Sequence, residues 1–233
     1  MSRIEWDKTG ERLYETGVDH AVLFPMGVDG KYGAGVPWNG ITAATESPSG
    51  AEANPQFADN IKYLNLISAE DFGLTLEAFT YPPEFGVCDG SAEPVPGLTI
   101  GQQKRRQFGL SYRTKIGNDV AGDALGYKLH IVYNCLAAPS ERNYQTVNDS
   151  PEPNSFSWEI TTTPVAITAT DAEGNGYNPT ALLVLDSTKI AKEKMTAVET
   201  LLYGTNAVDG GDAGTDPKLP TPDEIINILK AAG

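Results

Sequence analysis

Alternation of apolar and polar residues predicts β-structure through most of the middle of the chain. Apolar side chains recur at every second position in four stretches, the spacing of a strand with one buried face. These stretches are residues 72–81, 104–117, 127–135 and 155–167. Short apolar runs at 22–24 and 181–185 predict two further strands. The Asn-, Asp- and Gly-rich connection 118–126 joins the second and third stretches as a hairpin.

Helical spacing of apolar residues appears only near the C-terminus. Residues 189–203 have this spacing, and Gly204 follows at the position of a C-terminal cap. A second, short helix is expected after Thr221, because Pro222 and Glu224 complete a capping box with proline at the first helical position. The pattern therefore predicts a β-rich body followed by two helices.

Two segments have neither period. The first 20 residues are polar, with Trp6, Leu13 and Tyr14 widely spaced, and predict an arm that lies on another surface. Residues 42–60 are rich in Ser, Pro and Ala and predict a long loop, which in compact domains is usually functional or disordered. The chain thus divides into an arm (1–20), a β-domain (21–204, including loop 42–60 and helix 189–203), and a linker with a short helix (205–233).

Composition and charge narrow the class of protein. Hydrophobic residues make up 40% of the chain, as in ordinary globular proteins. The net charge is −14, with 17 Lys and Arg against 31 Asp and Glu. A negative net charge argues against a protein that binds nucleic acid by neutralising its phosphates. No apolar run approaches the ~20 residues of a membrane helix, and the N-terminus lacks the apolar core of a signal peptide. We expect a soluble protein made in the cytoplasm, without membrane insertion, in which Cys88 and Cys135 are buried thiols.

Candidate chemistry is sparse. His20 and His130 have no metal-ligand spacing with the two cysteines, and Asp209, Asp212 and Asp216 lack the spacing of a calcium loop. No phosphate-binding loop and no Gly-x-Ser-x-Gly motif occurs. A carboxylate pair such as Glu77 and Glu159 is uninformative where acids are so abundant. We expect no catalytic, cofactor or metal site and no enzyme activity; arm, loop and terminal helix point instead to assembly.

Longer strings carry a more specific signal. They are MSRIEWDKTGERLYETGVD (1–19), VPWNG (36–40), ESPSGAE (46–52), ADNIKY (58–63), IGQQ (100–103), VNDSP (147–151) and FSWEITTTP (156–164). Together with DST (186–188) and the ending LPTPDE (219–224), they resemble major tail proteins, or tail tube proteins, of long-tailed, siphovirus-type bacteriophages. The resemblance extends from residue 1 to about residue 190.

The resemblance implies a fold and an assembly. The fold is mainly β, a β-sandwich or partly closed barrel with a flanking helix, a long inter-subunit loop and terminal arms. The assembly is a hexameric ring that stacks into a hollow virion tail tube, built in the host cytoplasm. The tube encloses a tape measure protein, meets tail terminator and distal tail or baseplate proteins at its ends, and conducts double-stranded DNA.

Candidate residues follow from that assembly. An acidic channel wall repels phosphates, and Glu77 and Glu159 lie on polar strand faces as lumen candidates. Contacts between subunits or rings are expected at a wider set of residues: Trp6, Tyr14, Trp38, Glu46, Glu52, Lys104, Arg105 and Arg113. The cluster Lys104-Arg105-Arg106 is expected to pair with carboxylates of a neighbouring strand or subunit rather than with nucleic acid.

Two other functions remain open at this stage. The inner tube of a contractile tail or injection device shares the expected fold, and a sheath partner would distinguish it. A β-sandwich virion protein that binds carbohydrate belongs to another class and would need aromatic residues clustered on loops. Most aromatic residues here lie at strand positions or in the arm.

Overall fold

The computed structural model describes residues 3–147, 149, 152–171, 173–207 and 213–231. Asp209 and Asp212 of the C-terminal linker, and residues 148, 150 and 151 of the VNDSP string, lie outside the described residues. Strands in the first half are β1 (Tyr14–Pro25), β2 (Val36–Pro37), β3 (Ile41–Glu46), β4 (Ser49–Gly50), β5 (Ala53–Ala58), β6 (Ile61–Ile67), β7 (Glu70–Asp71) and β8 (Gly73–Ala78). The remaining elements are the 3-10 helix η1 (Pro83–Val87), β9 (Ala92–Val95), β10 (Leu98–Ile100), β11 (Phe108–Asn118), β12 (Gly122–Ala137), β13 (Phe156–Thr161), β14 (Leu182–Asp186), α1 (Lys192–Tyr203) and α2 (Pro222–Lys230).

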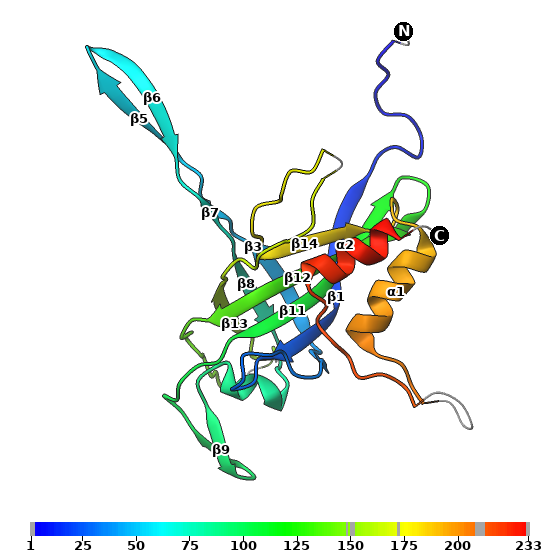
Figure 1. Cartoon of the computed structure of the whole chain (residues 1–233). Coiled ribbons are helices and arrows are strands. Elements are labelled where there is room, and N and C mark those ends of the chain that lie inside the picture. The colour runs from blue at the N-terminus through cyan, green and yellow to red at the C-terminus, as the bar shows by residue number, and fades with distance from the viewer. Residues whose placement is uncertain (1–2, 148, 150–151, 172, 208–212, 232–233) are drawn as a thin grey trace.

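The main sheet curls back on itself (Figure 1). Its strand order is β2-β1-β11-β12-β13-β8-β3, with β14 paired to β12. Strand β12 takes part in both halves, because its middle pairs with β11 and β14 whereas Leu136 and Ala137 pair with β13. Near the two ends of this path, β1 and β3 contact each other although they are not neighbours in the strand order. The predicted mainly β fold, a sandwich or partly closed barrel with a flanking helix, is confirmed.

Apolar side chains fill two separate cores. The interior core, between the two halves of the sheet, contains Trp38, Phe85, Phe108 and Trp158, whose rings contact one another edge to face or tilted, and the free thiols Cys88 and Cys135. The second core lies between the outer face of the sheet and the helices α1 and α2, which cover that face in Figure 1. It includes Leu129, Ile131, Tyr133, Val198, Leu202 and Ile225.

Because the sheet is covered on both faces, one prediction about β11 is wrong. Residues 104–117, which contain most of β11, were predicted to form a strand with one buried face. Ser111 is fully buried, and most of β11 is buried on both faces because the helices cover the second one.

Both predicted helices are present. The capping box of α2 is confirmed: Thr221 Oγ1 accepts from the Glu224 N–H, and Glu224 Oε2 accepts from the Thr221 N–H at 2.8 Å. Helix α1 ends at Gly204, whose φ of +70° lies in the region that favours glycine. The predicted spacing therefore located both helices to within a few residues.

The N-terminal arm is shorter than predicted. Residues 14–20 belong to strand β1, which pairs with β11 from Tyr14↔Gly117 onward, so the extended part described ends at residue 13. Its last turn is held against the β11–β12 connection, where the Gly10 N–H donates to Asp119 at 3.0 Å and Asn118 donates to the Gly10 carbonyl at 2.9 Å.

The predicted loop 42–60 is wrong in its secondary structure. Strands β3, β4 and β5 run outward and β6, β7 and β8 return, which makes one long hairpin. Its turn is Asp59-Asn60, both with positive φ (51° and 64°), the signature of a two-residue type I′ turn. Residues 49–71, here named the hairpin arm, project far from the body (Figure 1).

Candidate assembly surfaces

The hairpin arm exposes an unusual amount of apolar side chain. Phe57, for example, is 71% exposed. The others are Ile61, Tyr63, Leu64, Leu66 and Ile67. A two-stranded hairpin is marginally stable alone in water, and contiguous exposed apolar residues mark interaction sites. The arm is therefore the strongest candidate contact surface of the chain.

Apolar side chains occupy both faces of the hairpin arm. The pairs Asn54↔Leu66 and Gln56↔Leu64 place Leu64 and Leu66 on one face, whereas Ala53↔Ile67 and Phe57↔Lys62 place Ile67 and Phe57 on the other. Such a strand has no alternation of apolar and polar residues. For this reason alternation did not predict residues 61–67; the available signal was the high share of apolar residues in this segment, which only Lys62 and Asn65 interrupt.

A polar cluster fixes the base of the hairpin arm to the barrel. Glu46, the last residue of β3, accepts from Tyr112 OH at 2.7 Å, and its Oε1 lies 2.9 Å from His130 Nδ1. The His130 ring stacks on Tyr112, with its Nε2 3.0 Å from Thr114 Oγ1. The hydrogen bond with His130 lowers the pKa of the Glu46 carboxyl below its ordinary value. Glu46, predicted as an inter-subunit residue, instead joins β3 to β11 and β12 within the chain.

We expect Glu46→Gln to remove a pH-dependent part of the stability. Because the folded pKa of Glu46 is lowered, its contribution is present above the ordinary glutamate pKa of about 4.3 and is lost as pH falls through the folded value. The melting temperature of the variant should lie below that of the wild type at pH 7. The gap should narrow as pH falls below that ordinary value and close only below the lowered folded pKa, where the wild-type carboxyl is protonated and resembles an amide. A gap of constant size from pH 7 to pH 3 would contradict this account.

The lumen candidates lie together on one sheet face. Glu77 is opposite Ser157 and Glu159 is opposite Thr75, so the two carboxylates are diagonal neighbours on the outward face of β8 and β13. Glu159 is exposed and Glu77 is half-buried. Within the described residues neither carboxylate has an ion-pair partner. This outward face, here named the carboxylate face, stays a predicted lumen surface.

Trp38 is a core residue and not a contact residue. It is 3% exposed, and its indole N–H donates to the Thr80 carbonyl at 2.9 Å. The centre of its ring lies 4.5 Å from the centre of the Phe85 ring. The prediction for Trp38 is corrected accordingly. Four other contact candidates, Trp6, Tyr14, Glu52 and Lys104, are exposed and stay predictions.

The arginine candidates have partners within the chain. Arg105 lies 3.2 Å from Asp89 and donates to the Ala137 carbonyl at 3.1 Å, and Arg142 donates to the other oxygen of Asp89. Arg113 binds Asp19 at 2.9 Å. Arg105 therefore pairs with a carboxylate of its own chain, one of the two expected arrangements, and Arg113, expected at a contact with an adjacent subunit, also has an intrachain partner.

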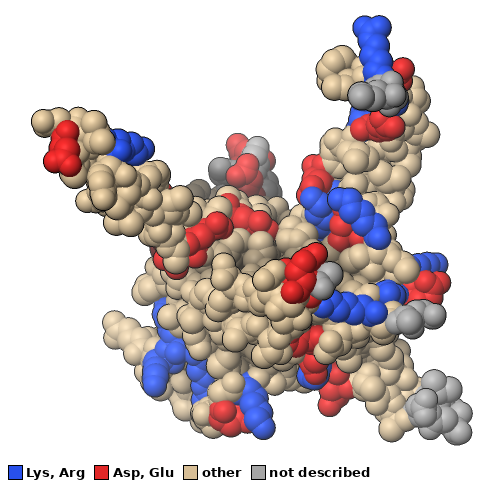
Figure 2. Space-filling view, turned by 45° about the horizontal axis from the view of Figure 1, so that its top comes forward, with Lys and Arg blue, Asp and Glu red and all other residues tan. Residues whose placement is uncertain are grey.

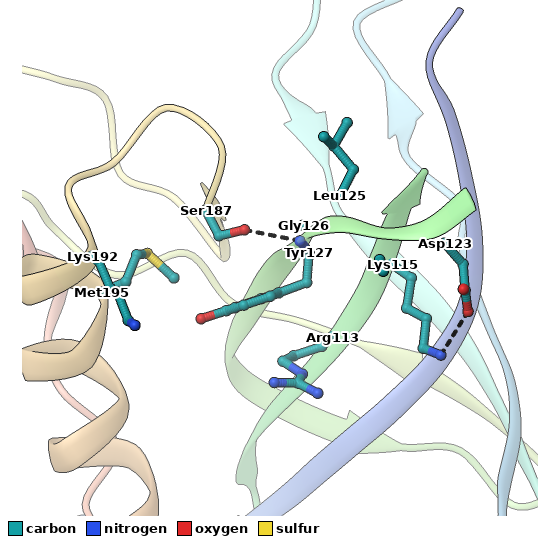
Figure 3. A pocket seen from close by; sticks show the side chains of 10 residues that line it. Arg113, Lys115, Asp123, Leu125, Gly126, Tyr127, Ser187, Lys192 and Met195 are labelled. Atoms are coloured by element: carbon teal, nitrogen blue, oxygen red, sulfur yellow. Dashed lines mark hydrogen bonds and ion pairs between the residues drawn. The ribbon is translucent and has the colours of Figure 1, made fainter. Parts of the chain in front are cut away.

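A shallow pocket lies between the start of α1 and the β11–β12 hairpin (Figure 3). Three cations line it, but Lys115 is paired with Asp123 at 3.0 Å and Arg113 with Asp19, and Arg113 also lies 4.7 Å from the Tyr127 ring centre. The third is Lys192. The Ser187 hydroxyl oxygen accepts from the Tyr127 N–H at 2.8 Å. Apart from Lys192, the charged groups named here are thus held in structural contacts.

In the described part of the chain, no group of three or more His, Cys, Asp and Glu side chains gathers in a way that could hold a metal ion. No helix that the structure describes is long and apolar enough to cross a bilayer.

The geometry defines a mainly β subunit with a partly closed barrel, two helices on one face and unburied extensions. No family model matches the sequence, and no curated protein sequence matches it significantly. Among solved structures, a chain of the anti-feeding prophage baseplate is 8% identical, with a TM-score of 0.38, covering 80% of this chain and 100% of that one. A chain of the PVC sheath-tube complex, an extracellular contractile injection system, is 11% identical, with a TM-score of 0.29 and coverages of 78% and 94%. Such TM-scores describe a partial overlap of chain traces and say nothing of function.

Proposed function

We propose that this chain is a structural tail protein of a bacteriophage, the subunit of a long-tailed phage tail tube. Hexameric rings of the chain stack into a hollow tube through which DNA passes from capsid to host. The observation that carries the proposal is the hairpin arm, an apolar extension that a lone subunit leaves in water. The resemblance of the sequence strings and the partly closed barrel support the same assignment.

The proposed assembly needs no turnover of substrate. The chain itself is the main partner, with a tape measure protein in the lumen and terminator and distal tail or baseplate proteins at the tube ends. A free sheet edge also favours self-assembly. Among the described residues β14 pairs with β12 alone, and an unpaired strand edge is a template for another strand.

Electron microscopy of the purified chain over a range of concentrations tests this proposal. Hollow tubes of constant diameter are the expected result, and six-fold rings in end views would support the hexamer. A particle that stays monomeric at all concentrations would overturn the proposal. A sheath protein bound around tubes isolated from phage particles would move the assignment to a contractile tail.

The carboxylate face gives a prediction about DNA passage. If Glu77 and Glu159 line the channel, Glu77→Lys with Glu159→Lys reverses two charges per subunit to attractive ones for phosphate. We expect phage carrying the double variant to form normal tubes but to eject DNA several-fold more slowly at low salt, with the difference shrinking as salt screens it. Single-particle ejection kinetics measure the effect. Glu77→Gln with Glu159→Gln is the matched control and should change the rate less.

Slower DNA ejection by the double lysine variant at low salt would support a position of the carboxylate face in the lumen. Unchanged ejection by phage that incorporates the lysine variant would place the carboxylate face away from the channel.

A further inference from the structure

The hairpin arm and a second hairpin leave opposite ends of the same strand. Strand β8 begins at Gly73, next to the arm, and ends at Ala78, after which the chain enters η1 and then the β9–β10 hairpin. Six residues of strand place those ends roughly 17 Å apart, at about 3.3 Å per residue. In Figure 1 the arm projects upward and β9 projects downward.

The β9–β10 hairpin also exposes apolar side chains. Leu98 is 52% exposed and pairs across the hairpin with Val95, and Ile100 is nearly as exposed. Thr99, which points the other way, lines a pocket with Arg105 and Arg142. Leu98 and Ile100 therefore form a small apolar face directed away from the body.

The two hairpins differ in charge. The hairpin arm contains four carboxylates and one lysine: Glu52, Asp59, Glu70, Asp71 and Lys62. Beside β9–β10, two guanidinium groups share the single carboxylate of Asp89, and Lys104 and Arg106 are exposed without an ion-pair partner in the described residues. The carboxylate of Glu93, in β9, accepts a hydrogen bond from the Gly97 N–H at 2.6 Å. Figure 2 shows blue side chains gathered on the side away from the arm.

We propose that the hairpin arm of one copy docks on the β9–β10 hairpin and residues 104–106 of a second copy. Apolar side chains meet apolar side chains, and the acidic arm meets exposed cations. Because the two surfaces differ and lie at opposite ends of the subunit, the contact is head-to-tail and repeats indefinitely. This inference rests on the proposed tube and assigns its stacking contact to residues.

Mixing two defective variants tests this contact. The donor-defective variant replaces residues 51–69 by Asn-Gly, and the receptor-defective variant carries Leu98→Asp with Lys104→Glu. The control carries the same chemical changes elsewhere, Val120→Asp with Lys192→Glu, at exposed positions of the β11–β12 connection and the start of α1. Circular dichroism and thermal melting establish that each variant is folded.

We expect the control to form tubes and neither defective variant to form them alone. Each defective variant keeps one intact surface, so their mixture should give a complex of twice the mass of either unit alone, with no further growth, in light scattering. Tubes from the receptor-defective variant, or no complex in the mixture while the wild type forms tubes, would overturn the contact alone. A wild type that never polymerises would overturn the proposed function and this contact with it.

Discussion

A chain in which Asn-Gly replaces residues 51–69 should fold and fail to form tubes. The β4–β7 pair Ser49↔Asp71 and Gly50↔Glu70 stays in place, and a two-residue Asn-Gly turn suits the shortened hairpin. The deletion removes six exposed apolar side chains, none of which belongs to either core. Each side chain of this kind contributes about 1.5–3 kcal/mol when fully buried. Even partial burial of the set amounts to several kcal/mol, or more than about a hundredfold in the critical concentration.

Thermal melting and sedimentation together measure this result. The melting temperature should stay close to that of the wild type, while the fraction that sediments as polymer falls to the baseline. Tyr63→Phe with Leu66→Ile keeps the arm apolar and serves as the control that still polymerises. If the shortened chain forms tubes as the wild type does, the hairpin arm is dispensable for polymerisation.

Trp38→Ala should destabilise the subunit by about 3–5 kcal/mol, the usual cost of removing a buried aromatic side chain. The centre of the indole ring lies 5.5 Å from that of the Trp158 ring. The hydrogen bond from the indole N–H to the Thr80 carbonyl would also be lost. Such a loss is a large share of the stability of an ordinary domain, about 5–15 kcal/mol. The variant should therefore melt at a clearly lower temperature than the wild type.

Urea denaturation of Trp38→Ala and Trp6→Ala compares the free energies of unfolding of a core variant and a surface variant. Trp6 is 77% exposed, so its replacement should change the free energy of unfolding by less than about 0.5 kcal/mol. Equal, small effects of the two substitutions would contradict the core position of Trp38.

Alternation predicts a strand most directly where a single face of that strand is directed at the interior core. Residues 72–81 are the clearest example, because Leu74, Leu76 and Ala78 are buried and Thr75 and Glu77 are not. Where both faces of a strand have the same character, alternation vanishes. That happened in the hairpin arm, which is apolar on both sides. Residues 104–117 kept enough alternation to be predicted as a strand, although β11 is covered on both sides.

Candidate residues were misassigned where the partner lies far along the chain. Glu46 binds Tyr112 and His130, 66 and more positions away, and Arg113 binds Asp19, 94 positions away. No local pattern reports such pairings. Trp38 was misassigned for a different reason: it stands alone between turn residues, so only the folded chain shows that it enters the core.

The two cysteines of the interior core bear on the chemical durability of the subunit. Burial raises the pKa of the Cys88 thiol to about 12 and raises that of Cys135 as well. Thiolate is the reactive form of cysteine, so at neutral pH both sulfurs are almost inert toward oxidants and disulfides. A particle built from this chain could pass from a reducing cell interior into an oxidising medium with its covalent structure unchanged.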